Sequence, residues 1–136
     1  MKVEVQAPDV EQLVKDYLQE VMFDVDCTIG IGVPSGWTKT STPHLEVASD
    51  GAPFADWPLF IHETIRLVAR AGSTSEAKEL CARGQGWLLA HNGNADISQT
   101  RFLSGVIPAR DAQTGAELAF CTSRVSVRTE PLAIGS

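Results

Sequence analysis

Residues 59–76, LFIHETIRLVARAGSTSE, contain a strand pattern followed directly by the start of a helix. In the first part, apolar and polar side chains alternate, which is typical of a strand with one buried face. Ser73 and Glu76 then have the spacing of a capping box, in which the two side chains bind free N–H groups of a first helical turn. Apolar residues recur at helical spacing after this point. The stretch therefore predicts a strand over 59–70 and a helix over 74–90.

Weaker patterns on both sides complete the predicted fold. Asp9 is placed to cap a helix with an apolar stripe, and Gly115 lies in the turn of a late hairpin. The predicted elements are helices over 9–22 and 74–90 and strands over 27–33, 44–49, 59–70, 102–109 and 117–128. Their order, α-β-β-β-α-β-β, predicts a single α+β domain over residues 1–136. We expect a mixed or antiparallel sheet of four or five strands, two helices packed mainly on one face, and a loose tail over 131–136.

The predicted core is formed by the apolar stripes of both helices and by alternate positions of the strands. Glu63 is an exception, because it interrupts the apolar side of its strand. The side chains that we expect to be buried are Leu13, Tyr17, Leu18, Val47, Ile61, Ile65, Leu80, Cys81, Trp87 and Leu88.

Composition limits the classes of protein to consider. The chain has 136 residues, 43% of them apolar, which suits one domain with a packed core. The formal net charge of −6 argues against the broad basic surface of a nucleic-acid-binding protein. No apolar run approaches the ~20 residues of a membrane helix, and residues 1–8 lack the apolar block of a signal peptide. We therefore expect a small soluble intracellular domain.

Charge is distributed unevenly along the chain. Residues 1–58 contain three basic and ten acidic residues, a net charge of −7. Residues 97–136 contain four arginines and three acidic residues, a net charge of +1. Unless folding mixes the two regions, this asymmetry predicts a molecule with two unlike faces whose copies could stack head to tail.

Several motif-like stretches lack the features that their chemistry requires. His62 and Glu63 begin like the zinc-binding HExxH motif, but Arg66 stands where the second histidine is needed. A strand also does not bring positions i and i+4 together as a helix does. Residues 30–36 contain three glycines, but their spacing differs from that of a dinucleotide-binding loop and no helix follows. These stretches therefore predict no metal or cofactor site.

The cysteines do not form a recognisable reactive or structural set. Cys27, Cys81 and Cys121 are an odd number at wide spacing, which argues against a disulfide framework. Cys81 and Cys121 fall at core positions, and neighbouring aspartates disfavour the thiolate of Cys27. We expect reduced thiols that bind no metal. The chain is predicted not to be an enzyme, with no catalytic, cofactor-binding or metal-binding residue.

The order and spacing of several motifs are more informative than any one of them. The motifs are a helix VEQLVKDYL (10–18), a strand end Val33-Pro34, a strand PHLEVA (43–48), a strand-to-helix passage ARAGSTSEA (69–77) and a hairpin Pro-x-x-Asp-x-x-Thr-Gly (108–115). In this order they resemble the tail terminator proteins of long-tailed, siphovirus-type bacteriophages, especially those infecting Actinobacteria. The resemblance covers about residues 10–130 of the chain. The sequence departs from the family pattern in its long 50–58 insertion and its acidic N-terminal third.

The resemblance implies a structural virion protein without catalytic residues or cofactors. Such proteins form a homohexameric ring on the last ring of the tail tube, stop tube polymerisation and provide the docking surface for the head–neck connector. Its partners would be copies of itself, the tail tube protein and the connector or stopper protein, with no membrane contact. DNA would pass through the ring without specific binding. The expected location is the tail or neck of the virion, and the host cytoplasm during assembly.

Two other classes of function remain open from the sequence. One is a different neck or tail connector of the same virion, such as a stopper or a tail-completion subunit. A stopper would bind the portal-adaptor side, whereas a terminator binds tube subunits. The other class is a small ligand-binding domain or enzyme, which would be a monomer with a closed, polar-lined pocket.

Candidate interface residues come from two regions. The loop aromatics Trp37, Phe54 and Trp57 are either contact points, since aromatic anchors dominate interface energies, or residues folded back onto the core of their own subunit. The hairpin over 102–128 is expected to contact a neighbouring subunit, and its arginines could pair with that subunit's acidic N-terminal region. The hairpin candidates are Arg110, Asp111, Gly115, Arg124 and Arg128.

Overall fold

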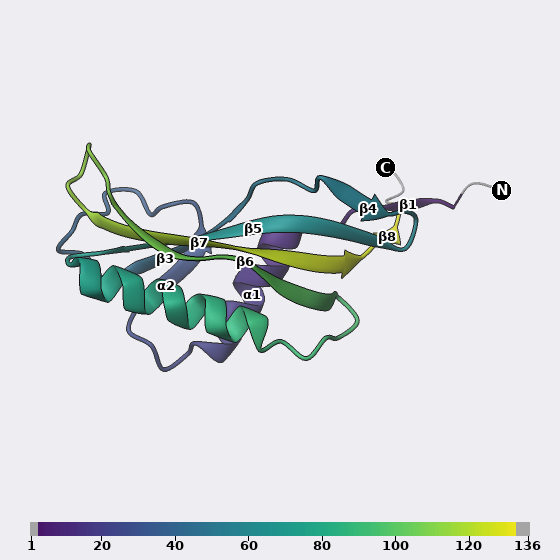
Figure 1. Cartoon of the computed structure of the whole chain (residues 1–136), viewed down its shortest axis with the longest axis horizontal. Coiled ribbons are helices and arrows are strands. Elements are labelled where there is room, and N and C mark those ends of the chain that lie inside the picture. Colours follow the sequence, from purple (N-terminus) through teal and green to yellow (C-terminus); the bar gives the residue numbers. More distant parts are fainter. Residues whose placement is uncertain (1–2, 133–136) are drawn as a thin grey trace.

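The computed structural model describes residues 3–132, whose main feature is a six-stranded sheet (Figure 1). Five strands lie in the order β2-β3-β5-β7-β6. They are β2 (Thr28–Ile31), β3 (His44–Ser49), β5 (Phe60–Ala71), β7 (Glu117–Arg128) and β6 (Ile97–Arg110). The sixth strand, β4 (Phe54–Asp56), pairs with the beginning of β5. β2 and β3 are parallel, and the other neighbours are antiparallel.

This arrangement confirms the predicted α+β fold with a mixed sheet. The main path has five strands, the upper number expected from the sequence, and β4 adds a sixth. β4 lies inside residues 50–58, where the sequence analysis predicts no strand. A strand of three residues forms there because β5 extends beyond the end of β3 and offers free backbone groups along residues 60–62.

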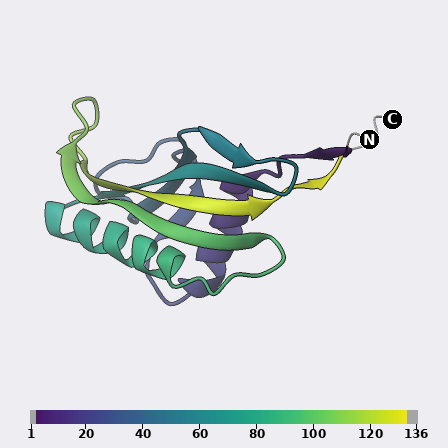
Figure 2. The same cartoon turned by 45° about the vertical axis from the view of Figure 1, so that its right-hand side comes forward.

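Two helices, α1 (Val10–Val21) and α2 (Thr74–Leu89), pack on the same face of the sheet (Figures 1 and 2). The side chain of Asp9 accepts from the Gln12 N–H at 3.2 Å, and that of Ser73 accepts from the Glu76 N–H at 3.2 Å. Both predicted N-caps are therefore confirmed. α1 packs over β2 and β3, and α2 over β5, β6 and β7. No helix within residues 3–132 has the length and apolar character needed to cross a membrane.

The alternation of β5 decides which side of the sheet is buried. Ile65 and Leu67 point toward the helices and are fully buried, as are the β7 residues of the same face. α2 approaches this layer closely at Gly84, where an added Cβ would lie 2.8 Å from a methyl carbon of Leu45. The absence of a side chain at Gly84 thus lets the helix rest on the sheet at this position.

The predicted core is mostly confirmed. Seven of the ten expected side chains are buried: Leu18, Val47, Ile61, Ile65, Leu80, Cys81 and Leu88. Leu13 and Tyr17 are half-buried, and the prediction for Trp87 is wrong, because this residue is 45% exposed. Gln85 takes a buried place on α2 instead, and its amide donates to the carbonyls of Ser104 and Thr122 at 2.8 and 3.3 Å.

The two ends of the described chain meet in a second small sheet. β1 (Val5–Gln6) pairs antiparallel with β8 (Glu130–Pro131), and the Leu132 N–H donates to the Glu4 carbonyl at 3.0 Å. The expectation of a loose tail is therefore wrong for residues 131 and 132, while 133–136 lie outside the described residues. In Figures 1 and 2 this pair lies at one end of the long axis, and the β6–β7 loop lies at the other.

Candidate functional site

The sheet face that points away from both helices is the main candidate surface, and we call it the open face. It follows from strand register, because residues directly opposite each other in neighbouring strands share a face. Even-numbered residues of β5 and β7 point to it, whereas the odd-numbered ones point to the helices. Its central side chains are Phe54, Phe60, His62, Thr64, Arg66, Arg101, Thr122, Arg124, Ser126 and Arg128.

Three arginines lie together near the middle of the open face, and we call them the arginine cluster: Arg66, Arg101 and Arg124. Arg101 on β6 is directly opposite Arg124 on β7. Arg66 on β5 is opposite Thr122, one diagonal step from Arg124. Like charges in such positions destabilise a sheet. The cluster therefore costs free energy that the fold itself does not require.

The charges of the arginine cluster are poorly compensated within the described part of the chain. Arg66 lies 3.6 Å from a carboxylate oxygen of Asp50, while Arg101 and Arg124 form no ion pair with any residue of 3–132. The Arg124 guanidinium instead lies over the Phe54 ring, with its Cζ 5.2 Å from the ring centroid. The Arg124 Nε is buried without a hydrogen-bond partner. Within the described residues, these guanidinium groups are therefore left with few acceptors for their N–H groups.

A serine, a histidine and an aspartate also form a chain on the open face. Ser126 Oγ lies 2.7 Å from His62 Nδ1, and His62 Nε2 lies 2.7 Å from Asp56 Oδ2. In a serine hydrolase the serine is accessible to substrate and the aspartate is buried. Here Ser126 is only 3% exposed, whereas the Asp56 side chain is 72% exposed. A substrate carbonyl cannot reach such a buried hydroxyl. The chain links β4, β5 and β7 and does not form a nucleophilic site.

The loop aromatics divide into two groups. Phe54 and Trp57 are 53% and 56% exposed, so they are surface residues and are not folded back onto the core. Trp37 is half-buried, and its Nε1–H donates to the Thr42 carbonyl at 2.9 Å, so it packs on its own loop. Only Phe54 adjoins the arginine cluster, through its contact with Arg124.

The hairpin candidates are partly used within their own subunit. Arg110 binds Glu117 across the hairpin at 2.7 Å, and Asp111 lies 3.5 Å from Arg70 at its base. The backbone N–H of Gln113 and the Thr114 hydroxyl hold the pKa of Asp111 below its ordinary value. Gly115 has a φ of 71°, which explains the glycine in this turn. These residues therefore shape the hairpin loop and stand apart from the arginine cluster.

A second arginine–aromatic pair lies on the open face, next to the pair formed by Arg124 and Phe54. Arg128 lies over the Phe60 ring with its Cζ 5.3 Å from the centroid, in the same arrangement as Arg124 over Phe54. Two arginine–aromatic pairs thus follow each other along β7. Sequence reasoning had identified Arg124, Arg128 and Phe54 but missed Arg66 and Arg101 as members of one surface. The alternation of residues 59–70 did place Arg66 on the polar side of its strand.

Glu63 lies on the helix-covered side, close to the beginning of α1. Burial raises the pKa of the Glu63 carboxyl; a hydrogen bond with Ser49 lowers it, and the charges of Glu11 and Asp9 raise it further. A carboxylate oxygen of Glu11 accepts a hydrogen bond from the Ser49 N–H at 2.8 Å. This group of carboxylates stabilises the local backbone but gives Glu63 an unfavourable charge at neutral pH.

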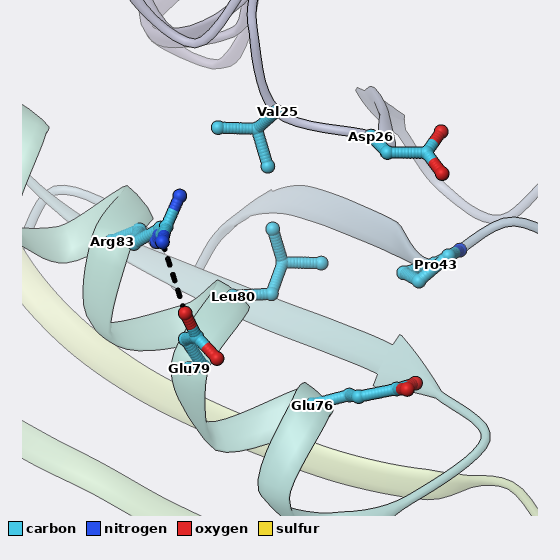
Figure 3. A pocket seen from close by; sticks show the side chains of 7 residues that line it. All are labelled: Val25, Asp26, Pro43, Glu76, Glu79, Leu80 and Arg83. Carbon is cyan, nitrogen blue, oxygen red and sulfur yellow. Dashed lines mark hydrogen bonds and ion pairs between the residues drawn. The ribbon is translucent and has the colours of Figure 1, made fainter.

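Small pockets lie on the helix side of the molecule. One, of about 170 Å³, lies between α2 and residues 25–26 (Figure 3). Its lining residues are Val25, Asp26, Pro43, Glu76, Glu79, Leu80 and Arg83. Figure 3 shows that Arg83 is engaged by Glu79, at 3.0 Å. This volume is below the ~300–1,000 Å³ of typical ligand pockets. A second pocket, of about 330 Å³, lies beside the turn after α1, and its lining is both apolar, as at Met22 and Phe23, and polar, as at Gln19 and Thr28.

No group of three or more metal-ligating side chains is present within residues 3–132. Cys81 and Cys121 are confirmed as core thiols, and Cys27 is half-buried. The hydrogen bond with Cys121, together with burial, raises the pKa of the Cys81 thiol. Comparison with protein-family models and with curated protein sequences finds no match for the chain.

Proposed function

We propose that this protein is a structural virion subunit, a tail terminator that forms a ring at the head-proximal end of a phage tail tube. In this role it stops tube polymerisation and presents the docking surface for the head–neck connector. The proposal starts from the ordered series of motifs between residues 10 and 130. It predicts a protein whose surfaces are made for other protein chains.

The open face is the observation that carries the proposal. A subunit with helices on one side of its sheet and a bare arginine–aromatic surface on the other has two unlike faces. Unlike faces suit head-to-tail contacts, which generate rings when the rotation between copies closes. Isologous dimers, by contrast, use the same patch twice.

Exposed apolar side chains give further support. Exposed apolar surface on a small protein marks contacts with other proteins where the residues gather. The exposed large residues include Phe23, Phe54, Trp57, Leu59, Trp87, Phe102, Leu103 and Ile107. Phe102, Leu103 and Ile107 lie on the sheet edge formed by β6, whereas Phe23 and Trp87 lie on the helix side. One partner surface would therefore not cover all of the exposed apolar residues. A ring subunit that also contacts a tube and a connector has enough neighbours to do so.

The elongated shape suits such a role. The β6–β7 loop and the β1–β8 pair lie at opposite ends of the long axis (Figures 1 and 2). A ring of such subunits has two chemically different surfaces available for two different partners. One would be the tail tube protein and the other the head–neck connector.

The test uses the purified protein together with the tail tube protein of the same phage. We expect addition of this protein to polymerising tubes to stop growth at one end, with a ring visible at the tube tip by negative-stain microscopy. Tubes that continue to lengthen and carry no added ring would contradict the proposal. Binding to the portal-adaptor assembly without binding to tubes would instead assign a stopper role.

A further inference from the structure

An acidic strip runs along α1 and the turn that follows it. It consists of Asp16, Glu20, Asp24 and Asp26, all exposed. Asp16 lies 3.6 Å from Lys15 and accepts from the Gln12 amide, whereas Glu20, Asp24 and Asp26 form no ion pair with any residue of 3–132. The last turn of α1 contains no basic residue, so Glu20 places a negative charge at the negative end of the helix dipole. At Glu20 the strip therefore places a charge where the isolated subunit gains nothing from it, as the arginine cluster does on the other face.

The two costly charge groups are of opposite sign and lie on opposite faces. α1 covers β2 and β3 on the helix side, whereas the arginine cluster lies over β5, β7 and β6 on the open face. One subunit cannot join them. Two copies arranged head to tail can, and both penalties then become attractions.

The spacings of the two charge groups are compatible. Asp16 and Glu20 are four residues apart on a helix, which separates them by about 6 Å. Directly opposite residues such as Arg101 and Arg124 have Cβ atoms about 5 Å apart, and diagonal neighbours such as Arg66 are about 7–8 Å away. A row of carboxylates on a helix can therefore face a row of guanidinium groups on a sheet without distortion of either element.

Each charge group also contains an exposed aromatic ring. Phe23 is 84% exposed and lies between Glu20 and Asp24 in the sequence. Phe54 is 53% exposed and stacks with Arg124 at the edge of the arginine cluster. Aromatic anchors surrounded by charged groups are the usual composition of an interface centre with a polar rim. This chain carries two surfaces of this composition, one with Phe23 and one with Phe54.

We propose that the acidic strip and Phe23 of one copy dock on the arginine cluster and Phe54 of the next copy. This contact rests on the proposed function for its closure into a ring, but it is a claim about self-recognition in its own right. The occupant of the open face is thus a second copy of this chain. Nucleic acid is the competing anionic occupant, and it is disfavoured by the net charge of −6.

The experiment is a charge swap followed by sedimentation velocity at low and high salt. The sheet variant carries Arg66→Glu and Arg101→Glu, and the helix variant carries Glu20→Arg and Asp24→Arg. A combined variant carries all four changes. A control with Lys39→Glu and Lys78→Glu alters the net charge as much as the sheet variant, at exposed positions outside both groups. Circular dichroism establishes that each variant is folded.

We expect the wild-type chain to self-associate more strongly at low salt. The sheet and helix variants should each associate on the order of 100-fold more weakly, because like charges then face each other. The combined variant should recover most of the association, and the control should behave like wild type. If the sheet variant does not fold, the helix variant alone still tests the contact.

Several results would overturn the inference. These are wild-type protein that stays monomeric at every concentration, charge variants that associate like wild type, or a combined variant that does not recover. Binding of a short DNA duplex that the sheet variant loses and the helix variant keeps would show that nucleic acid occupies the open face.

Failure of this contact can be told apart from failure of the proposed function. If wild-type protein caps tubes although the charge variants associate normally, only this contact is wrong. If the swap succeeds but tubes are not capped, the contact stands and the proposed function fails.

Discussion

Arg101 and Arg124 lie directly opposite each other on β6 and β7, on the sheet face that the helices leave uncovered. Neither arginine has an ion-pair partner within residues 3–132. In the assembly proposed above, this pair would contact a neighbouring copy of the chain. Replacing one of the two arginines therefore tests whether the pair weakens the folded subunit and strengthens its self-association.

We expect Arg101→Gln to stabilise the isolated subunit while weakening self-association. Removing one of two facing positive charges should raise the free energy of unfolding by roughly 0.2–1 kcal/mol. Urea denaturation at low protein concentration measures this gain, which should shrink at high salt because salt already screens the repulsion. Arg83→Gln is the matched control. It removes an arginine that pairs with Glu79 on α2, so it should give no gain. A destabilised Arg101→Gln subunit would show that this arginine serves the fold.

Two glycines of α2 should respond oppositely to substitution by alanine. Each Gly→Ala change in a helix gains about 1 kcal/mol in backbone propensity. At Gly84 the new Cβ would lie 2.8 Å from a methyl carbon of Leu45 and 3.3 Å from one of Leu67, so overpacking costs about 1–3 kcal/mol. At Gly86 no atom lies within 4 Å. Thermal unfolding should therefore show Gly86→Ala as stabilised and Gly84→Ala as unchanged or destabilised. Equal stabilisation of both would contradict the close packing at Gly84.

Gln85 should be needed to hold α2 on the sheet. Its side-chain amide donates to the Ser104 and Thr122 carbonyls, and it is buried. Gln85→Met keeps the volume but leaves these carbonyls without their donor, so we expect a loss of about 1–3 kcal/mol in the free energy of unfolding. The exposed Gln99→Met is the control and should change stability little. Hydrogen exchange should show faster opening of β6 near Ser104 in the Gln85 variant only.

The sequence was most informative where structure depends on neighbouring residues. The caps at Asp9 and Ser73 and the alternation along 59–70 are local signals, and all three reappear in the structure. β1 and β8 could not be predicted in this way. Each has only two residues and forms by pairing with the other, which lies at the opposite end of the described chain. Their composition contains no strand pattern.

The candidate surface was only partly predictable for a similar reason. Arg124 and Arg128 alternate within one strand, so their shared face can be deduced from the sequence. That Arg101 faces Arg124 depends on the register of β6, which is shifted by irregularities between Ile97 and Gln99 and again after Phe102. A one-residue shift moves a side chain to the other face of a sheet. The burial of Gln85 in place of Trp87 likewise depends on acceptors in β6 and β7 that lie far away in the sequence.

Glu63 is expected to make the stability of this protein depend on pH. Burial, together with the nearby Glu11 and Asp9 charges, raises the pKa of its carboxyl in the folded state, against the opposing hydrogen bond with Ser49. The folded protein therefore holds this proton more tightly than the unfolded chain does. The stabilisation from the protonated form is fully present below the unfolded pKa and is lost as the pH rises through the folded pKa. At neutral pH, the charged carboxylate thus lowers the free energy of unfolding.

We accordingly expect Glu63→Gln to raise the thermal midpoint at pH 7, because the amide keeps a polar group near Ser49 without a buried charge. The difference from wild type should decrease as the pH is lowered through the carboxyl range, since wild-type Glu63 then becomes neutral too. Differential scanning calorimetry from neutral to acidic pH measures both effects. The exposed Glu4→Gln is the control, since it removes the same charge from the surface. A Glu63→Gln variant that is less stable at pH 7, or whose gain persists unchanged in acid, would show that the Glu63 charge is favourable where it lies.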